Sequence, residues 1–412
     1  MGSEWREVAL SEVADLTGGY AFKSRDYASS GRFVLRTLNI SDDGSITRDD
    51  AVYLPEALCP QYERFVLQAD DTLFVMVGAT LGKVGLVQSK DLPALLNQNM
   101  WRIRARPGVA DPRFIHYAFR HAVQGSLGWA SGSAREFVRR DDYRNLLIPV
   151  PPLAQQIAIG EMLGALDDKI ELNRRMSQTL ESMARALFKS WFVDFDHLKD
   201  GALDPAGWED RPLADILTLE KGLSYKGAGL SDYGVPMVTL GCFARGDQLI
   251  EDGIKHYVGD YRDRHTVRPG DLLIANTDIT QRREVLGSPA LVPDVNGADA
   301  VLFTHHVFAA RFVPGKDQVW RLFAYYALLQ EGFRERARGF ATGTTVLALP
   351  PAAVLNYSVP MPPEPIVKAF NGAVLPLLQR RWQMASECRA LVTVRDALLP
   401  VLLSGARPGR PT

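Results

Sequence analysis

Apolar residues in a long central segment recur at helical spacing. Across residues 163–192, "LGALDDKIELNRRMSQTLESMARALFKSWF", they follow a pattern of three- and four-residue steps with charged residues between them. The seam positions are Leu163, Leu166, Ile170, Leu180, Leu187 and Trp191. The segment contains no proline, and its only glycine is Gly164. These steps give the seven-residue repeat of a coiled-coil seam, so the pattern predicts one long amphipathic helix.

Most of the remaining chain alternates between turns and short runs of β-forming residues. The runs typical of strands are 32–40, 72–77, 101–105, 272–275 and 307–312. Turn dipeptides such as Asp43-Gly44 and Pro269-Gly270 bound them. Two segments, 111–124 and 317–338, have the spacing of shorter helices. The pattern therefore predicts a mixed α/β module on each side of the long helix.

The chain contains this pattern twice. Trp5 and Trp208 open similar runs, and Asp71 and Asp271 occupy matching places in "LQADDTLFVMVGAT" and "VRPGDLLIANTDIT". Pro-Pro pairs at 151–152 and 362–363 are 211 residues apart, and each begins a long helical segment. The same offset separates two apolar seams: Ile159, Leu163, Leu166, Leu180, Leu187 and Trp191 in the first, and Phe370, Val374, Leu377, Leu391, Leu398 and Leu402 in the second. A duplicated module with its own helix explains these matches.

Each long helix needs a partner for its apolar face. A helix of about 40 residues is about 60 Å long, and the matching partner in the chain is the other copy. If each helix keeps the same relation to its own module, the two helices run antiparallel. We therefore predict an α+β fold, with two mixed α/β domains related by pseudo-two-fold symmetry and separated by two long antiparallel coiled-coil helices. The expected domains are 1–149, a helical spacer 150–204, 205–361 and a second spacer 362–412.

Composition is typical of a globular protein of the cytoplasm. The 412 residues, 46% hydrophobic and 23% charged, are too many for one core. No apolar run approaches the roughly 20 residues that span a bilayer, so we expect no membrane partner. Cys59, Cys242 and Cys388 stand far apart, which favours reduced thiols. The net charge of −1 neither demands nor excludes nucleic acid, so any DNA site depends on a local patch.

Two similar modules at the ends of a strut suit a DNA duplex with two half-sites. One turn of the duplex spans about 34–36 Å, so modules tens of ångströms apart can meet successive grooves on one face. Because the two copies have diverged, the half-sites need not have the same sequence. The strut would then set the gap between them.

The segment "PPLAQQIAIGEMLGALDDKIELNRRMSQTLESMARALFKSWFVDFD" closely resembles the central repeat of specificity subunits of type I restriction-modification systems. "GDLLIANTDIT" and the two Pro-Pro joints are also similar to that family, and the resemblance extends over essentially the whole chain. It implies two target-recognition domains that read double-stranded DNA and two conserved helical regions, in a subunit without catalysis or cofactor of its own.

The same resemblance implies partners. Two modification subunits would carry S-adenosylmethionine and methylate adenine, and restriction subunits would add ATP-driven translocation and cleavage with ATP and magnesium. Two alternatives to this reading remain open. One is a stand-alone DNA methyltransferase or nuclease, and the other is an interaction scaffold that does not bind DNA.

Motifs for catalysis are absent or incomplete. "GATLGKV" at 78–84 has too few residues between its glycines for a phosphate-binding loop, and the required Ser or Thr does not follow. His305 and His306 are adjacent in a strand-like run and so point to opposite faces, without evident companion metal ligands. "LDDK" at 166–169 lies on a helix without an evident third acid. We therefore expect no catalytic or metal site.

Candidate DNA-binding residues are polar, basic or aromatic, and they occupy loops at equivalent places in the two copies. In the first copy they are Tyr20, Phe22, Lys23, Thr80, Lys83, Asn97, Gln98, Asn99, Ser131, Ser133 and Arg135. In the second they are Tyr225, Lys226, Thr280, Gln281, Arg282, Arg283, His305, His306, Thr342 and Thr344. Such residues can contact phosphates and the edges of bases, although ordinary exposed turns have the same composition.

Candidate partner-binding residues lie on the first long helix. They are Asp167, Asp168, Lys169, Glu171, Arg174, Phe188, Trp191 and Phe192. A solvated charged face and aromatic packing onto the second module are the alternatives. The second helix lacks the "DDKIELN" block, and Arg381 occupies the seam position of Ile170. Pro376 lies inside its pattern and predicts a kink or break near Leu375.

Overall fold

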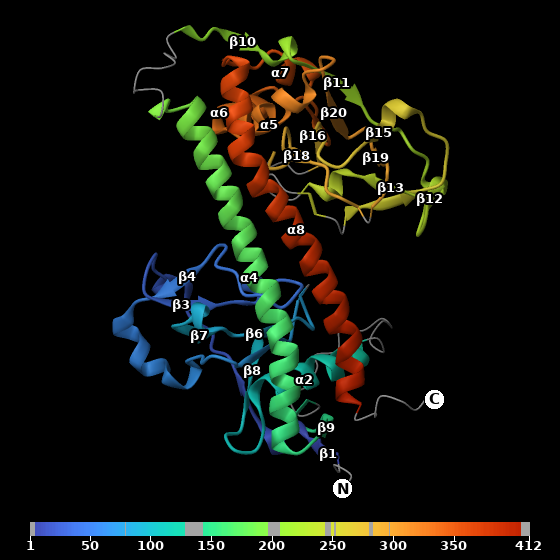
Figure 1. Cartoon of the computed structure of the whole chain (residues 1–412). Coiled ribbons are helices and arrows are strands. Elements are labelled where there is room, and N and C mark those ends of the chain that lie inside the picture. Colours follow the sequence, from blue (N-terminus) through green and yellow to red (C-terminus); the bar gives the residue numbers. More distant parts are fainter. Residues whose placement is uncertain are drawn as a thin grey trace. The chain divides into compact units, whose positions relative to one another are not determined.

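The computed structural model describes residues 5–78, 80–127, 143–196, 207–243, 249–250, 253–279, 283–295 and 297–404 (Figure 1). The chain forms two compact units. Unit 1 comprises Met1–Leu172 and Glu387–Thr412, and unit 2 comprises Asn173–Ser386. Each unit boundary therefore falls inside one of the two long helices, so each unit contains a part of both.

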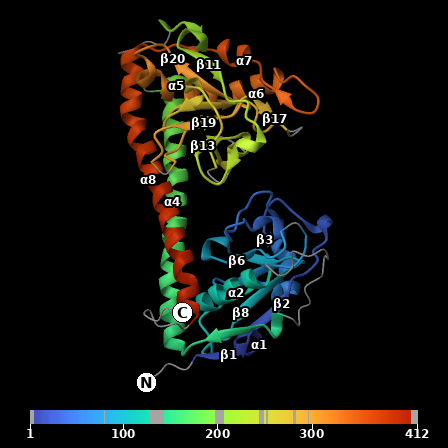
Figure 2. The same ribbon diagram turned by 90° about the vertical axis from the view of Figure 1, so that its right-hand side faces the viewer.

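Unit 1 is built on a four-stranded antiparallel sheet and a smaller three-stranded sheet. The four-stranded sheet has the order β2 (Ala14–Gly18), β8 (Met100–Ala105), β5 (Thr72–Val75) and β6 (Val84–Leu86). The smaller sheet has the order β4 (Val52–Leu54), β3 (Arg32–Leu35) and β7 (Ala94–Leu96). β1 (Arg6–Ala9), followed by the short α1 (Leu10–Val13), pairs with β9 (Leu147–Val150). Helix α2 (Pro112–Leu127) packs on the larger sheet (Figure 2).

Unit 2 repeats this plan. Its four-stranded sheet has the order β11 (Leu217–Lys221), β20 (Val307–Phe312), β16 (Leu272–Ala275) and β18 (Pro289–Leu291). A five-stranded sheet follows the order β12 (Leu230–Ser231), β14 (Lys255–Tyr257), β13 (Val235–Val238), β19 (Val301–Phe303) and β15 (Thr266–Val267). Two strand pairs complete it, β10 (Asp210–Pro212) with β22 (Ser358–Pro360) and β17 (Thr277–Asp278) with β21 (Leu347–Ala348). The helices are α5 (Asp317–Leu328), α6 (Glu331–Gly339) and α7 (Pro351–Leu355).

The two long helices confirm the internal repeat. α4 spans Leu153–Phe192 and α8 spans Glu364–Leu403, and both contain 40 residues. Their first and last residues differ by the same offset as the two Pro-Pro pairs in the sequence. The strands 272–275 and 307–312 are confirmed. The strand predicted for 32–40 is too long, because β3 ends at Leu35 before a short 3-10 turn. The single helix predicted for 317–338 is also wrong, because α5 ends at Leu328 and α6 begins at Glu331.

Both long helices contribute to the core of each unit. In unit 1, Leu399 and Leu403 of α8 belong to the same buried cluster as Ile159 and Leu163 of α4. In unit 2, Phe188 of α4 packs against Phe370 of α8, with ring centroids 5.8 Å apart. In unit 1, Asp167 meets Arg395, whereas Ile170, further along α4, meets the earlier residue Cys388. In unit 2, Glu181 meets Arg381, whereas Phe188 meets the earlier residue Phe370. The helix segments within each unit therefore run antiparallel, as predicted.

Two details of α8 differ from the prediction. The helix continues through Pro376 without interruption, so the break expected near Leu375 is wrong. Leu375 and the side chain at 376 lie on the exposed face, where an interrupted hydrogen bond is open to water. Phe370 and Val374 are buried as predicted, but the later buried positions are Leu378, Leu399 and Leu403 rather than the adjacent residues 377, 398 and 402, which are only half-buried.

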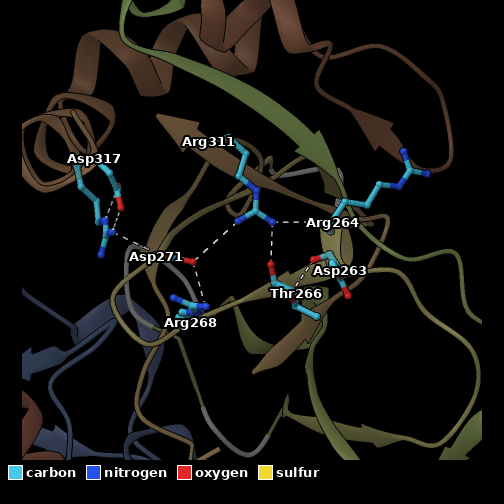
Figure 3. Close-up of polar contacts among 8 residues, drawn as sticks. Asp263, Arg264, Thr266, Arg268, Asp271, Arg311 and Asp317 are labelled. Atoms are coloured by element: carbon cyan, nitrogen blue, oxygen red, sulfur yellow. Dashed lines mark hydrogen bonds and ion pairs between the residues drawn. The ribbon is translucent and has the colours of Figure 1, made fainter. Parts of the chain in front are cut away.

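An aspartate–arginine pair holds the same loop against the sheet in both units. In unit 1, Arg104 Nε and Nη2 lie 2.6 and 2.7 Å from the carboxylate oxygens of Asp71, which also accepts a bond from Gln68 N. In unit 2, Arg311 lies 3.9 Å from Asp271, which accepts from Arg268 N (Figure 3). Both arginines also donate to backbone carbonyls, at Val66 and Thr266 respectively. The duplication thus extends to individual contacts.

The two pairs differ in burial. The side chain of Asp71 is 1% exposed, whereas that of Asp271 is 22% exposed and is shared between Arg311 and Arg321. Removing one partner of a buried ion pair leaves the other charge without compensation. We predict that Asp71→Ala lowers the free energy of unfolding of unit 1 by about 3–5 kcal/mol. The equivalent Asp271→Ala lowers that of unit 2 by only about 1–2 kcal/mol. Urea unfolding followed by hydrogen exchange resolves the two units, and equal losses would contradict the burial argument.

Candidate nucleic-acid interface

In unit 1, three loops meet at one end of the four-stranded sheet. Gly19 N, just after β2, donates to Met100 O at 3.0 Å, and Gln98 N donates back to Tyr20 O at 2.8 Å. Met76 N, just after β5, donates to Asn99 O at 2.9 Å. The segment 97–99 before β8 is therefore held between the loops that follow its two neighbouring strands. Backbone bonds fix this frame, which leaves side chains free to vary.

Unit 2 has the same frame with the same bonds. Gly222 N donates to Val307 O at 3.3 Å, His305 N to Leu223 O at 3.0 Å, and Asn276 N to His306 O at 3.0 Å. Residues 304–306 therefore occupy the place of residues 97–99. Asn97, Gln98 and Asn99 of unit 1 and His305 and His306 of unit 2 therefore lie on equivalent segments.

A glycine is required at one point of each frame. A Cβ atom at Gly19 would lie 1.8 Å from Asn97 O, and one at Gly222 would lie 2.3 Å from Thr304 O. Both distances are far below any real contact between nonbonded atoms. The close passage of two backbones, rather than an unusual φ angle, therefore explains the glycine in both copies.

The side chains on the two frames differ. In unit 1, Gln98 and Asn99 are exposed, Asn97 is buried with its amide donating to Tyr27 Oη at 3.2 Å, and Asn99 has a φ of 69°. In the left-handed region that such a φ defines, asparagine is among the favoured non-glycine residues. Unit 1 therefore presents amide groups, which can both donate and accept hydrogen bonds.

Unit 2 presents two imidazoles at the equivalent place. The rings of His305 and His306 are half-buried and lie 3.9 Å apart between centroids. Thr277 Oγ1 lies 3.0 Å from His306 Nδ1. Burial lowers the pKa of His306, and the neighbouring His305 and Lys221 lower it further. The His306 ring is therefore neutral at pH 7 and offers one donor and one acceptor, with Nδ1 engaged by Thr277.

The loop after β2 in unit 1 and the loop after β11 in unit 2 both carry aromatic and basic candidate side chains. Tyr20 is 36% exposed and packs against Phe22, which is buried, and both contact Tyr62. In unit 2, Tyr225 is half-buried against Tyr257, 6.2 Å between centroids. Lys23 and Lys226 are exposed beside them. Phe22 is thus part of the core, whereas the two lysines and Tyr20 are accessible.

The remaining described candidates are partly engaged within the protein. Lys83 is half-buried, lies 2.7 Å from Asp42 and donates to Ile40 O. Thr80 is half-buried nearby. Arg283 is exposed, and its Nη1 donates to Arg338 O at 2.7 Å. Thr342 and Thr344 are exposed in the turn before β21, where Thr342 also bonds to Ala348 O. The turn that holds Thr342 and Thr344 lies next to the segment around Thr277 and Asp278, since β17 pairs with β21.

Six candidates lie outside the described residues, namely Ser131, Ser133, Arg135, Thr280, Gln281 and Arg282. The sequence pattern did not point to Asp278, which precedes that last group. Its carboxylate Oδ2 accepts from Val285 N at 2.8 Å and from Leu286 N at 3.3 Å. Asp278 is 1% exposed, so it anchors the base of the loop rather than facing solvent. Only the return of the chain to Val285 identifies this role, and no local motif encodes it.

The charged candidates on α4 make contacts inside unit 1. Asp167 accepts from Tyr117 Oη at 2.6 Å and from Arg395 at 2.7 Å, and Asp168 pairs with Arg113 at 2.8 Å. Lys169 lies 3.4 Å from Glu387, and Glu171 pairs with Lys90. These residues attach α4 to the rest of unit 1 and to α8. The sequence analysis considered only a solvated face or a docking surface for them. Arg174 is exposed.

The aromatic candidates on α4 lie against unit 2. Phe188 and Phe192 are 3% and 5% exposed and belong to its largest buried cluster. Trp191 is half-buried against the same cluster, 6.0 Å from the ring of Phe370. These three side chains pack on their own unit, which agrees with the simpler of the two interpretations of the sequence.

Part of the sequence matches a known protein family. Residues 2–182 match the family model described as the type I restriction modification DNA specificity domain. The chain is similar to the specificity subunits of type I restriction-modification systems. The MjaIX specificity subunit of Methanocaldococcus jannaschii is 26% identical over 357 residues, which cover 81% of this chain and 77% of that one. The HindI specificity subunit of Haemophilus influenzae is 24% identical, over 64% and 70% of the two chains.

The fold of the chain also has a solved counterpart. The crystal structure of the type I restriction-modification S subunit from M. genitalium matches 97% of this chain and 96% of that chain, with a TM-score of 0.62 and 17% identity. The described part of the chain contains no group of His, Cys, Asp or Glu residues arranged to hold a metal ion. No described helix is both long and apolar enough to cross a bilayer.

The glycine of the unit 2 frame provides a test of its rigidity. We predict that Gly222→Ala lowers the free energy of unfolding of unit 2 by about 1–3 kcal/mol, because the new methyl group meets two backbone carbonyls. Gly227→Ala, a few residues along the same loop, meets no atom within 4 Å and should change it by less than about 0.5 kcal/mol. Urea unfolding measures both. Equal stability of the two variants would show that the backbone around Gly222 can shift at little cost in free energy.

Proposed function

We propose that each unit of this specificity subunit reads one half of a bipartite target in double-stranded DNA. The observation that carries the proposal is the pair of matching frames. The same backbone bonds hold residues 97–99 and 304–306, yet one frame presents amides and the other imidazoles. A fixed frame with exchanged side chains is what two related readers of different sequences require, because base-edge donors and acceptors specify the sequence.

Gln98 and Asn99 suit adenine, whose N6 and N7 can be read by an amide that donates and accepts. The neutral ring of His306 can make a single bond to a base edge, and the exposed lysines near both frames can contact phosphates. Lys23 and Lys226 occupy the same loop in the two units and would position each unit on the backbone. Six further candidates, Ser131, Ser133, Arg135, Thr280, Gln281 and Arg282, stay in this proposal as sequence-based candidates.

We further propose that α4 and α8 set the gap between the half-targets and carry two modification subunits. The exposed face of α4 supports a docking role, because it presents Met162, Leu172, Met176 and Met183, each 39–51% exposed. Exposed methionines adapt to a partner surface at small cost. The engaged charges Asp167, Asp168, Lys169 and Glu171 would support this face from within rather than contact the partner directly.

In this proposal the specificity subunit needs no cofactor. S-adenosylmethionine would be bound by the modification subunits, and ATP and magnesium by restriction subunits where these are present. A stand-alone methyltransferase or nuclease and a scaffold that does not bind DNA have no observation in their favour.

A test of divided reading compares one change in each frame within the assembled complex. We predict that Gln98→Ala weakens discrimination by about 1–3 kcal/mol at one half of the target only, and that His306→Ala does so at the other half only. Gln318→Ala, at an exposed position of α5, serves as the control and should leave both halves unchanged. Binding to duplexes with one altered half measures this. Loss at both halves from either change would argue against separate reading.

A test of the docking face uses charge. We predict that Met176→Glu combined with Met183→Glu lowers the affinity for modification subunits at least tenfold, because two carboxylates would lose water at the interface. Val109→Glu, at a similarly exposed position outside both long helices, is the matched control and should have a smaller effect. Analytical ultracentrifugation of the mixed subunits gives the affinity. Unchanged assembly would remove this face of α4 from the interface.

A further inference from the structure

The seam between α4 and α8 contains one largely buried ion pair in each unit. In unit 1, Arg395 Nη1 lies 2.7 Å from Asp167 Oδ1, with the two side chains 10% and 26% exposed. In unit 2, Arg381 Nη1 lies 2.5 Å from Glu181 Oε2, with the two side chains 13% and 7% exposed. Ion pairs at such depth contribute little net stability, but breaking one by removing a partner is costly.

Further contacts hold each carboxylate in place. The second oxygen of Asp167 accepts from Tyr117 Oη at 2.6 Å, and Asp396 lies 2.7 Å from Arg395. The second oxygen of Glu181 accepts from Arg185 Nε at 2.9 Å. The carboxylates therefore sit in one fixed position, and the arginine of α8 must reach that position to compensate them.

Both units use the same register of the two helices. The step forward along α4 from Asp167 to Glu181 is equal in length to the step back along α8 from Arg395 to Arg381. The equal steps mean that one antiparallel alignment accounts for the pairing in unit 1 and, separately, for the pairing in unit 2.

At the equivalent place of the other unit, each ion pair is replaced by an apolar pair. By the constant offset between α4 and α8, the counterparts of Asp167 and Arg395 are Leu378 and Ala184, which are 1% and 0% exposed in the core of unit 2. The counterparts of Glu181 and Arg381 are Val392 and Ile170. Ile170 is 3% exposed in unit 1, and its carbonyl lies 3.7 Å from Cys388 Sγ of α8.

This exchange has a consequence for pairing with a second copy of the chain. If the α4 of another copy took the place of α8 in the same register, Asp167 would face Ala184 and Glu181 would face Ile170. If α8 paired with α8, Arg381 would face Val392 and Arg395 would face Leu378. Every one of the four charges would then lie against an apolar side chain without its partner.

We propose that these four residues form a pairing code that makes the seam an interaction surface for one partner, the other helix type of this chain. The internal repeat gives α4 and α8 the same length and the same apolar spacing, so packing alone would also allow α4 with α4 and α8 with α8. The code penalises both, because specificity requires that wrong partners be made unfavourable. The code concerns how the chain assembles with itself and is independent of DNA recognition.

The test uses the folded full chain, with a protease recognition sequence inserted between Gly201 and Ala202. After cleavage, the N-terminal and C-terminal fragments are allowed to exchange in dilute urea, and native mass spectrometry measures which pairs form. We predict that the wild-type fragments recover only the mixed pair of one N-terminal and one C-terminal fragment. A statistical mixture that includes N-terminal and C-terminal homodimers would overturn the proposal.

A variant without the code supplies the comparison. Asp167→Leu, Glu181→Val, Arg381→Ile and Arg395→Ala together give each ion pair the apolar residues of its counterpart in the other unit. We predict that its cleaved fragments form all three pairs. Mixed pairs alone, from this variant, would show that the four charges do not select the partner.

A charge exchange keeps the test decisive if the fourfold variant does not fold. Glu181→Arg with Arg381→Glu restores an ion pair in reversed order. When cleaved wild-type and charge-exchanged proteins are mixed, we predict that each N-terminal fragment recovers only the C-terminal fragment of its own kind. Crossed pairs in equal amount would refute the code, since they place two arginines or two glutamates opposite each other.

Discussion

The apolar seam of a 40-residue helix is the constraint on which the rest of this protein depends. Such a helix cannot stand alone in water, because one face is apolar along most of its length. The structure buries this apolar face in two separate cores. The early residues of α4 complete the core of unit 1 together with the last turns of α8, and the opposite ends of both helices complete the core of unit 2. Each core therefore combines segments that are far apart in the sequence.

The two units share one architecture, and we relate function to the residues in which the two copies differ. The order of the four-stranded sheets, the aspartate–arginine pairs and the glycine-dependent loop frames are the same in both units. Some of the residues that differ lie on the frames and in the helix seam. Backbone bonds and buried apolar contacts maintain the common plan, which leaves the loop side chains free to diverge toward two DNA sequences.

Much of this could be predicted from the sequence, because periodic signals are strong over long segments. The repeat located both long helices, and its constant offset is reproduced at both helix ends. The loops were also located, since glycines and polar residues recur at matched places. The errors have local causes. Pro376 lies on an exposed face of α8, where one lost backbone bond does not end a helix held by its seam. The helix predicted for 317–338 ends early, with Leu329 and Gln330 separating α5 from α6.

Tertiary partners could not be predicted. The block "DDKIELN" reads as a solvated or docking surface until the structure brings Tyr117, Arg113 and Lys90 against it. From the sequence alone, Arg381 interrupts an apolar seam without explanation. The structure shows that Glu181, 200 residues earlier, compensates its charge. A charge in a seam becomes meaningful only when the residue that compensates it is known, and spacing along one helix carries no information about the other.

The central claim is the proposal that the paired helices set the gap between the two halves of the DNA target. Mapping of methylated adenines tests it most directly, in hosts that carry the wild-type system or one with a single heptad inserted into both α4 and α8. One heptad preserves the seam repeat and adds about 10 Å, or about three base pairs. The account predicts a target with two specified runs whose sequences stay the same while the gap lengthens by about three base pairs. An active, folded variant with an unchanged gap, or a target without a gap, would contradict it.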